Sequence, residues 1–465
     1  MPEPLPSPTR GTVHPTKTAT QQLAGLALSV ADDPAAREPA RDAVVDWYGA
    51  TVAGRMMSAS QIAARAPFLD EPGRARLIPD GRPASVRTAA LLNGLFSHEA
   101  EMDDIYREGL YHPGSPTVAA ALAVAEGLDA SGAALLAAVA GGYEVGCRVA
   151  ETVNPAHYRY WHTTGTVGTL GSAAAAGLLL GLDEDRLAHA LAVATSMAAG
   201  LQQAFRSGSM SKPLHAGHAA EAGVVAAGLA SEGYRGTPEV LDGDLGFGVA
   251  MSDGPSWAGL ADAAARPPAV SQVTVKPHAC CGHTFAAVDA ALDLRAQGLD
   301  ARRIRSVEVD TYQVAIDVAG GRSVDTAGEA KFSVGYCVGA ALSLGTVGMD
   351  AFDQRHLDDP ALRWFAANTA LAADPQMDAT FPGRRQARVV VVDDDGREWR
   401  AERATRRGDP DSPLSPEERR TKFDGMVVPV LGTEAAARLH EALSGLADLE
   451  RVVQIPLGTT GVDHG

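Results

Sequence analysis

Three acidic residues lie close together in one polar stretch: Glu101, Asp103 and Asp104. His112 follows them in a His-Pro-Gly-Ser turn that opens onto an alanine-rich run. Carboxylates beside a histidine can orient it for proton transfer, and free N–H groups at a helix start can bind an anion. The alternative interpretation is a solvated acidic loop in which Ser115 caps the helix that follows.

A second polar stretch begins at His162 and continues through Thr163 into a run of threonine, glycine and alanine. Such a turn before a helix leaves backbone N–H groups free to bind an anion, with His162 and Thr163 beside them. The glycines have no preceding strand and the wrong spacing for a dinucleotide-binding loop. An alternative is that Gly165, Gly168 and Gly171 serve close helix packing, and both interpretations can hold together.

Lys212 precedes Pro213, which places its ammonium group at a helix entry, where the helix dipole acts on the same anion. His215 and His218 follow at a spacing of one helical turn, and Glu221 lies one turn further along. This ladder is an alternative metal site, but zinc usually needs another ligand from elsewhere in the chain. We therefore expect no metal.

Lys276 begins a turn that contains the adjacent Cys280 and Cys281. Two neighbouring thiolates do not easily bind one tetrahedral metal, and no second cysteine pair completes such a site. The turn is instead expected to present Lys276 and backbone N–H groups to an anion. Further along, Tyr336 is a candidate proton donor, although a tyrosine in an apolar helix is more often a core residue.

These candidates lie at predicted helix ends or in turns, where polar groups from distant segments can converge. Lysines and histidines beside carboxylates suit a di- or tricarboxylate that loses a proton next to a carboxylate. The cations would hold the carboxylates and stabilise the enolate-like charge, while a neutral base takes the proton. No motif for a hydride carrier or a Schiff base is evident, so we expect chemistry without a cofactor.

The composition is that of a globular protein, with 465 residues, of which 46% are hydrophobic. The net charge of −17 argues against a nucleic-acid partner, because phosphate binding needs a basic face. Four cysteines are too few for a disulfide framework, and residues 1–20 lack the apolar core of a signal peptide. The uncharged run 165–182 is expected inside a helix bundle and not in a membrane. A cytoplasmic location is the default expectation.

Helical periodicity begins near Ala19, and nearly every segment between residues 84 and 250 has the pattern of a helix. We therefore expect a mainly α fold, with a flexible tail over residues 1–17 and an all-helical domain over 18–270. Helix caps and stops follow from residue type. The predicted N-caps are Ser115, Ser131 and Asp183, and the predicted stops are Gly127, Gly181 and Gly233.

The pattern changes after Pro267-Pro268 and predicts a smaller α+β domain over residues 271–411. Alternation predicts strands at 272–276 and 304–310, and the sequence Asp-Asp-Gly at 394–396 predicts a hairpin turn. The chain is helical again after Ser412, and this part can belong to either domain. The hairpin strands are expected at 387–393 and 398–403, and helices at 285–297 and 332–344.

The order of these motifs resembles the MmgE/PrpD family of 2-methylcitrate dehydratases, cis-aconitate decarboxylases and related epimerases. The resemblance runs from about Ala19 to Leu449 and implies an active site between two domains of a homodimer. It also implies that 412–457 returns to the helical domain, so that 271–411 is an insertion. The motifs that carry it are Asn93-Gly94, the acids and turn of 98–115, Gly142-Tyr-Glu-Val145, His162-Thr-Thr-Gly-Thr, Lys212-Pro-Leu-His-Ala-Gly, Lys276-Pro with the cysteine pair, and Phe332-Ser to Tyr336.

The resemblance implies roles for single residues as well. Glu101 stands where the family has its first aspartate, Ile105 where it has a threonine, and Cys281 where the decarboxylases have a histidine. Lys212 and Lys276 would bind carboxylates. The catalytic candidates are His112, His162, Glu101, Asp103, Asp104 and Tyr336. Because the sequence departs from the family here, Arg107, Tyr111 and Arg206 are candidates for different substrate contacts, and the other candidate contacts are Thr163 and Cys281.

Together these residues predict a cofactor-independent lyase, in first place a dehydratase or hydratase of a small polycarboxylate or hydroxy acid. An epimerase or decarboxylase on the same scaffold is the second hypothesis. A catalytically silent binding homologue is the third. A changed substrate is expected to show at Glu101, Ile105 and Cys281, where the sequence departs from the family.

Overall fold

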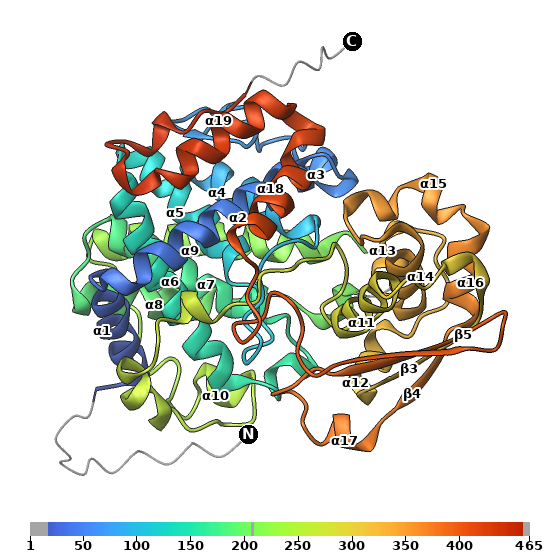
Figure 1. Ribbon diagram of the computed structural model, residues 1–465. Helices are drawn as coiled ribbons and strands as arrows, with labels where there is room; N and C mark the ends of the chain where they lie inside the picture. The colour runs from blue at the N-terminus through green and yellow to red at the C-terminus, as the bar shows by residue number, and fades with distance from the viewer. Residues whose placement is uncertain (1–16, 206–208, 459–465) are drawn as a thin grey trace.

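The computed structural model describes residues 17–205 and 209–458, which form a large helical part and a smaller mixed part (Figure 1). The mainly α fold expected from the sequence is confirmed. In the ribbon, the blue and green helices and the red helices near the C-terminus make up the large part, and the gold to orange-red segments around the sheet make up the smaller one. The predicted tail, apart from Lys17, and the predicted substrate contact Arg206 lie outside the described residues.

Several helices begin and end where local residue types predict. Ser131 and Asp183 cap α6 (Gly132–Val153) and α8 (Glu184–Ser196), because their side chains accept hydrogen bonds from backbone N–H groups three residues on. Gly181 and Gly233 follow α7 (Thr163–Leu179) and α9 (Ser211–Ser231). Their φ angles of +69° and +89° are conformations that glycine adopts without strain.

The predictions for Ser115 and Gly127 are wrong, because both residues lie inside α5 (Gly114–Leu128). Pro113 precedes the first turn, and the Ser115 hydroxyl donates to the carboxylate of Asp103 instead of capping the helix. The helix ends at Asp129, whose φ of +59° is left-handed. An aspartate therefore takes the place expected for glycine, as short polar side chains tolerate this conformation.

Helix α7 packs against α5, α6, α8 and α9 within the large part. A Cβ atom at Gly168 would lie 2.7 Å from the ring of Pro116, and one at Gly171 would lie 3.0 Å from the carbonyl oxygen of Gly142. The glycines therefore allow close approach of neighbouring helices, as the packing interpretation predicts. The threonine and glycine residues of α7 are buried as far as Gly177.

Four strands form the sheet of the smaller part, in the order β4-β3-β5-β6. β3 (Ile304–Thr311) is parallel to β4 (Ala370–Ala373) and antiparallel to β5 (Ala387–Asp393). β5 and β6 (Glu398–Arg403) form the predicted hairpin. Alternate residues of β5 are buried, and both β5 and β6 pack against α11 (Phe285–Ala296), so one sheet face joins the core.

One strand prediction in this part is wrong. Residues 272–276 form no strand, because only Thr274 pairs, through an isolated bridge to Ile105. The helix expected at 332–344 is confirmed as α14 (Val334–Leu344), which Ser333 caps with its side chain, and the short α13 (Ala327–Lys331) precedes it. The short elements elsewhere are α3 (Ser58–Ala63), β1 (Ala75–Arg76), β2 (Pro83–Ala84), α10 (Phe247–Ala250), α12 (Gln313–Ala319), α15 (Gln354–Leu357), α16 (Pro360–Asn368) and α17 (Pro375–Asp378).

The end of the chain lies against its beginning. Ser415 caps α18 (Pro416–Leu431), with proline at the first helical position as predicted. α18 and α19 (Thr433–Ser444) pack on α2 (Arg37–Arg55), where the red and blue ribbons lie together in Figure 1. The Lys422 ammonium group of α18 lies 2.5 Å from the carboxylate of Asp46. The other long helices are α1 (Ala19–Ala31) and α4 (Val86–Glu99).

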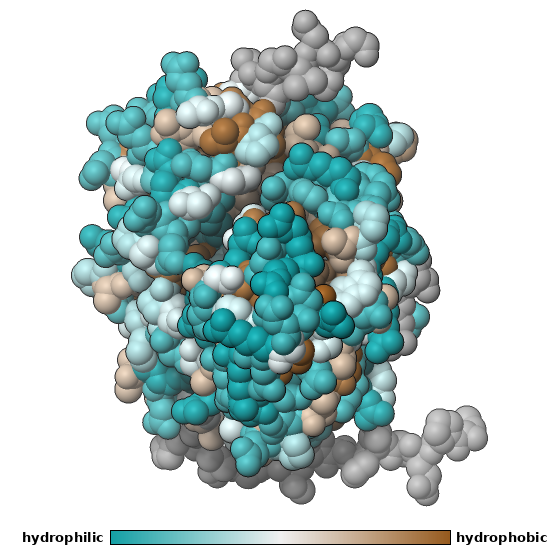
Figure 2. Space-filling view, turned by 45° about the vertical axis from the view of Figure 1, so that its right-hand side comes forward, coloured by the Kyte–Doolittle hydropathy of each residue, from teal (hydrophilic) through white to brown (hydrophobic). Residues whose placement is uncertain are grey.

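One helix of the described residues, α6, is long and apolar enough to cross a membrane. Of its apolar window, 83% is buried inside the protein, which is typical of a core helix. The surface seen in Figure 2 is largely hydrophilic, and its hydrophobic residues are scattered between polar ones. Single exposed apolar side chains of this kind are normal on a folded protein.

Candidate active site

The segment between α4 and α5 is held in place from several directions. Ile105 and Thr274 exchange backbone hydrogen bonds of 3.0 and 2.7 Å. Two buried lysines donate to backbone carbonyl oxygens on either side of Glu101: Lys331 to Ala100 at 3.1 Å and Lys422 to Met102 at 2.9 Å. Glu101 itself has a φ of +59°, which is unusual for glutamate. Distant parts of the chain thus fix the backbone of the acidic segment.

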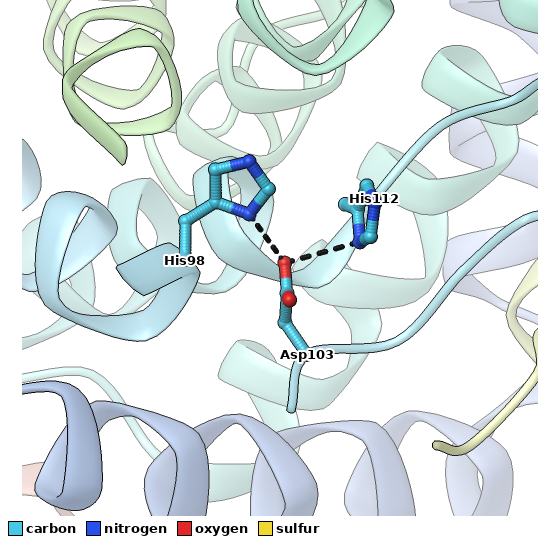
Figure 3. A group of neighbouring side chains, drawn as sticks. All are labelled: His98, Asp103 and His112. Atoms are coloured by element: carbon cyan, nitrogen blue, oxygen red, sulfur yellow. Dashed lines mark hydrogen bonds and ion pairs between the residues drawn. The ribbon is translucent and has the colours of Figure 1, made fainter. Parts of the chain in front are cut away.

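Asp103 lies between two histidines (Figure 3). Its Oδ2 atom is 2.6 Å from His98 Nδ1 and 3.2 Å from His112 Nδ1, and it accepts a hydrogen bond of 2.8 Å from the Ser115 hydroxyl. Burial by itself would raise the pKa of Asp103, but the two imidazoles and Lys276 outweigh it and hold the pKa well below its usual range. Asp103 is therefore an anion that orients both rings through their Nδ1 atoms.

His98 and His112 differ in how far they are accessible. The His98 side chain is fully buried, whereas that of His112 is 17% exposed. Burial lowers the pKa of His98 to about 4, although Asp103 opposes this shift. His98 is thus a neutral ring inside the protein, and His112 is the histidine of this pair that a substrate can reach.

The second acid, Glu101, lies between two lysines. One carboxylate oxygen forms an ion pair with Lys212, and the other lies 3.4 Å from Lys276 Nζ. Lys276 also donates to the Glu101 carbonyl oxygen at 2.9 Å and lies 3.5 Å from Asp103 Oδ1. Burial opposes both charges, but their attraction lowers the pKa of Glu101 and raises that of Lys276. Two cations thus meet two anions, and of these Lys276 and Asp103 are buried.

His162 joins the same cluster from the start of α7. Its ring stacks on that of His98 with centroids 5.4 Å apart, and its Nδ1 lies 3.0 Å from Nδ1 of His215. Burial, followed by the charges of His98 and Lys212, keeps the pKa of His162 well below its usual range. His162 is therefore a neutral ring beside the lysines.

The metal interpretation of the ladder on α9 is not supported, because its three side chains have different partners. His215 contacts His162, whereas His218 donates to the carbonyl oxygen of Met197 at 3.3 Å. Glu221 forms an ion pair with Arg87 at 2.6 Å. Among the described residues, His98, Asp103 and His112 come closer to a metal-binding geometry, with ligand atoms within 4.8 Å of one another. Their carboxylate already has a hydrogen bond with His98 and lies 3.2 Å from His112 Nδ1, which suits proton transfer better than metal binding.

Neither of the two predicted tyrosines, Tyr336 and Tyr111, belongs to the cluster. The Tyr336 hydroxyl is buried and donates to the carbonyl oxygen of Ala351 at 2.7 Å, which contradicts its role as a proton donor. Tyr111 is fully buried, and its hydroxyl oxygen packs against Gly146 of α6. Both tyrosines are core residues, the alternative that the apolar surroundings of Tyr336 suggested.

Two further predicted substrate contacts have partners within the protein. The guanidinium of Arg107 lies 3.4 Å from Asp409 and 3.6 Å from Asp411. The Thr163 hydroxyl accepts a hydrogen bond of 3.2 Å from the Asn154 side chain. The neighbouring Thr164 is the threonine that contacts the turn, because its hydroxyl accepts from His112 N at 3.3 Å. The predicted contacts through Arg107 and Thr163 are therefore not supported.

Asp104 and Cys281 lie near the cluster with different partners. Asp104 accepts hydrogen bonds from Gly114 N and the Tyr143 hydroxyl, and burial raises its pKa to about 7. The Cys281 thiol is buried, which raises its pKa to about 11. Asp104 therefore anchors the turn before α5, and Cys281 is a neutral thiol beside the charges of Glu101 and Lys276.

Sequence reasoning missed the roles of His98, Ser115, His215 and Lys331. His98 and Ser115 were visible as the ends of the acidic stretch, but nothing in the spacing shows that both contact Asp103. His215 was visible in the ladder, although its partner is a histidine from α7. Lys331 carries no local signal for its contact with Ala100, because 231 residues separate them.

The chain belongs to the MmgE/PrpD family. The MmgE/PrpD N-terminal domain matches residues 21–259, and the MmgE/PrpD C-terminal domain matches residues 278–448. The cis-aconitate decarboxylase-like protein oryM of Aspergillus oryzae is 28% identical over 93% of this chain and 95% of its own length. The human cis-aconitate decarboxylase is 30% identical over 78% of this chain and 77% of its own, and that of Aspergillus terreus is 28% identical over 54% and 53%.

Proposed function

We propose that this protein is a cofactor-independent lyase that acts on a small polycarboxylate, with dehydration as the leading reaction. The observation that carries the proposal is the contact of Lys276 with both Glu101 and Asp103, because Asp103 in turn orients His112. This contact brings a carboxylate-binding cation to a histidine that can accept a proton. Both groups are needed to remove a proton next to a carboxylate.

His112 is proposed as the base. Its Nδ1 faces Asp103, so Nε2 is the nitrogen available to the substrate. The anionic Asp103 stabilises the imidazolium that forms when His112 takes the proton. Lys212 and Lys276 stabilise the negative charge that develops on the carboxylate next to the reacting carbon.

In dehydration, the C–H bond breaks, its electron pair forms the carbon–carbon double bond, and the hydroxyl group leaves with a proton as water. The proton that His112 has taken from carbon is the one that leaves with the hydroxyl group, and His162, whose ring stacks on His98 beside Lys212, is proposed to relay it. A histidine held neutral by burial has to gain its proton during the reaction and lose it readily. The family resemblance and the paired histidines support this reading.

Decarboxylation is the second candidate, and the relatives known as cis-aconitate decarboxylases favour it. Here the bond between the carboxylate carbon and its neighbour breaks, carbon dioxide leaves, and a histidine protonates the remaining carbanion. The same lysines would stabilise that carbanion through a neighbouring carboxylate. Cys281 and Glu101, where the chain departs from the family, are the residues proposed to distinguish the two reactions.

Incubation of the purified protein with citrate, 2-methylcitrate and cis-aconitate tests the proposal. Dehydration gives an ultraviolet absorbance rise from the new double bond, and decarboxylation releases carbon dioxide. The variant His112→Gln is expected to lose at least 100-fold in kcat, whereas His356→Gln on α15 keeps full activity. If all three substrates stay unchanged but still bind, the protein is a silent binding homologue and the lyase proposal is wrong.

We also propose that the protein is a homodimer in the cytoplasm. Large apolar side chains are exposed close to Lys212, which supports an interface there. The four cysteines are free, as a reducing compartment requires. Light scattering after size-exclusion chromatography and fractionation of expressing cells test these two points. The exposed apolar residues are Leu201, Phe205, Met210 and Leu214.

A further inference from the structure

Arg385 is a buried arginine without an acidic partner. It lies between α17 and β5, and only 4% of its surface is exposed. One guanidinium nitrogen donates to the carbonyl oxygen of Arg107 at 3.3 Å, and its buried Nε has no hydrogen-bond partner among the described residues. No acidic oxygen of the described residues lies within 4.0 Å of it. A guanidinium with five donors is thus almost unused.

The neighbouring acids are already occupied by other arginines. Arg406 binds Asp409 through two nitrogens, at 2.6 and 3.1 Å. Arg107 shares Asp409 at 3.4 Å and Asp411 at 3.6 Å. Burial, followed by the charge of Arg406, lowers the pKa of Arg385 to about 10, so the guanidinium still carries its charge at neutral pH. The structure therefore contains one buried positive charge that the neighbouring residues do not neutralise.

A buried charge without a partner lowers the stability of the folded protein, because the interior solvates it poorly. Such a cost is retained where a ligand supplies the missing partner. The planar guanidinium fits a carboxylate, whose two oxygens can accept two parallel N–H bonds. The ring of Phe381 lies 5.8 Å from the guanidinium carbon and stacks on Tyr312, so one side of Arg385 is bounded by aromatic residues.

Arg385 is connected to the candidate active site in two ways. Its hydrogen-bond partner Arg107 belongs to the segment between Asp104 and His112. The ring of Phe381, which lies beside Arg385, is also 6.4 Å from the ring of His283, two residues after Cys281. Arg385 thus lies beside two segments, those of Arg107 and His283, that also carry residues of the candidate site.

The charges of the cluster leave little net attraction for a substrate with several carboxylates. Lys212 and Lys276 already contact Glu101, and Lys276 also contacts Asp103. These two cations and two anions balance, which leaves Lys331, bound to the carbonyl oxygen of Ala100, as the one excess positive charge among these residues. Arg385 supplies a further positive charge, and its planar group fits a carboxylate.

We infer that Arg385 is a substrate-binding residue that takes one carboxylate of a polycarboxylate, beside the lysines that hold another. The inference rests on the proposed function and adds the residue that selects a substrate with an additional carboxylate. It predicts that a tricarboxylate binds more tightly than the dicarboxylate that lacks the group held by Arg385.

The variant Arg385→Met tests the inference by two measurements, the melting temperature and the Kd for citrate. A purely structural role predicts a change in the first, whereas a role in binding predicts a change in the second. The melting temperature of the ligand-free protein is expected to stay equal or rise, because an unpaired buried charge is removed. The Kd for citrate, measured by calorimetry, is expected to rise about 10- to 100-fold. Arg385→Lys keeps the charge but loses the fork of donors, so its Kd is expected to lie between those of the other two proteins.

The matched control is Arg406→Met, which leaves Asp409 without its bidentate partner and is expected to lower the melting temperature strongly. A lower melting temperature for Arg385→Met with an unchanged Kd for citrate overturns the inference. If the native protein turns citrate over and the native protein and Arg385→Met bind citrate equally, the inference is wrong but the lyase proposal stands. Binding that depends on Arg385 without any turnover supports the inference and contradicts the lyase, and no citrate binding by the native protein overturns both.

Discussion

Lys276 contacts Glu101 twice, through a hydrogen bond of 2.9 Å to its carbonyl oxygen and an ion pair of 3.4 Å with its carboxylate. The first contact fixes the backbone of the acidic segment, and the second fixes the direction of the acid. Lys276 therefore joins the turn after residue 275 to the segment between α4 and α5. The candidate site depends on this connection, because its acids and lysines come from separate parts of the chain.

Replacing Lys276 with methionine is expected to destabilise the protein by about 3–5 kcal/mol, because the buried carboxylate of Asp103 loses its lysine and Glu101 keeps only Lys212. The free energy of unfolding in urea measures the effect. The double variant Glu101→Gln/Lys276→Met is expected to lose less than the sum of the two single variants. Additive losses would contradict a direct interaction between the two side chains.

The variant Asp103→Asn is expected to lower kcat about 10²- to 10⁴-fold, because an amide no longer stabilises the imidazolium of His112. Steady-state kinetics measure the change, with whichever of citrate, 2-methylcitrate and cis-aconitate the native protein converts. Asp104→Asn is the matched control, since it makes the same chemical change at the next residue, whose partners are Gly114 N and the Tyr143 hydroxyl. Equal losses in the two variants would show that Asp103 has no special role.

The sequence predicts much of the helical fold because caps, glycines and periodicity are local signals. Ser131 and Asp183 act as predicted for this reason. The partners of Arg107, Tyr111 and Tyr336 depend on contacts between distant segments, which spacing along the chain does not contain. The sequence predicts which residues are able to do chemistry, whereas the fold decides which of them meet.

The stability of the folded protein is expected to depend on pH through the ionisation of Asp104. Its folded pKa of about 7 lies above the value of about 3.9 for an unfolded aspartate, because burial disfavours the charge. The folded state therefore holds more protons between these values, so stability is full below about pH 4 and falls as the pH rises through 7. The loss is at most roughly 4 kcal/mol, from about 1.4 kcal/mol per pKa unit.

Urea unfolding of the native protein and Asp104→Asn at pH 5 and pH 8 measures this contribution. The native protein is expected to lose more stability than the variant between these two pH values, since asparagine does not ionise. Asn retains an oxygen for Gly114 N and an amide group for the Tyr143 hydroxyl, so the turn before α5 is expected to persist. Identical pH dependence of the two proteins would contradict a raised pKa at Asp104.

Lys331 is expected to act on the reaction through the backbone. Its ammonium group donates to the carbonyl oxygen of Ala100 at 3.1 Å, immediately before Glu101 with its φ of +59°. Lys331→Met removes that hydrogen bond and is expected to lower kcat/KM about tenfold, the equivalent of about 1.4 kcal/mol. The control is Lys17→Met, since Lys17 is an exposed lysine whose ion pair with Glu184 lies away from the acidic segment.

The pH profile distinguishes positioning from a direct charge effect at Lys331. Burial lowers the pKa of Lys331 to about 8, so half of the ammonium groups have lost a proton at that pH. Activity of the native protein is therefore expected to fall between about pH 7 and pH 9, and Lys331→Met is expected to lack this fall. If Lys331→Met shows the same fall of activity at high pH, the fall is due to another group. A variant with native kcat/KM at every pH shows that the hydrogen bond to Ala100 does not position Glu101.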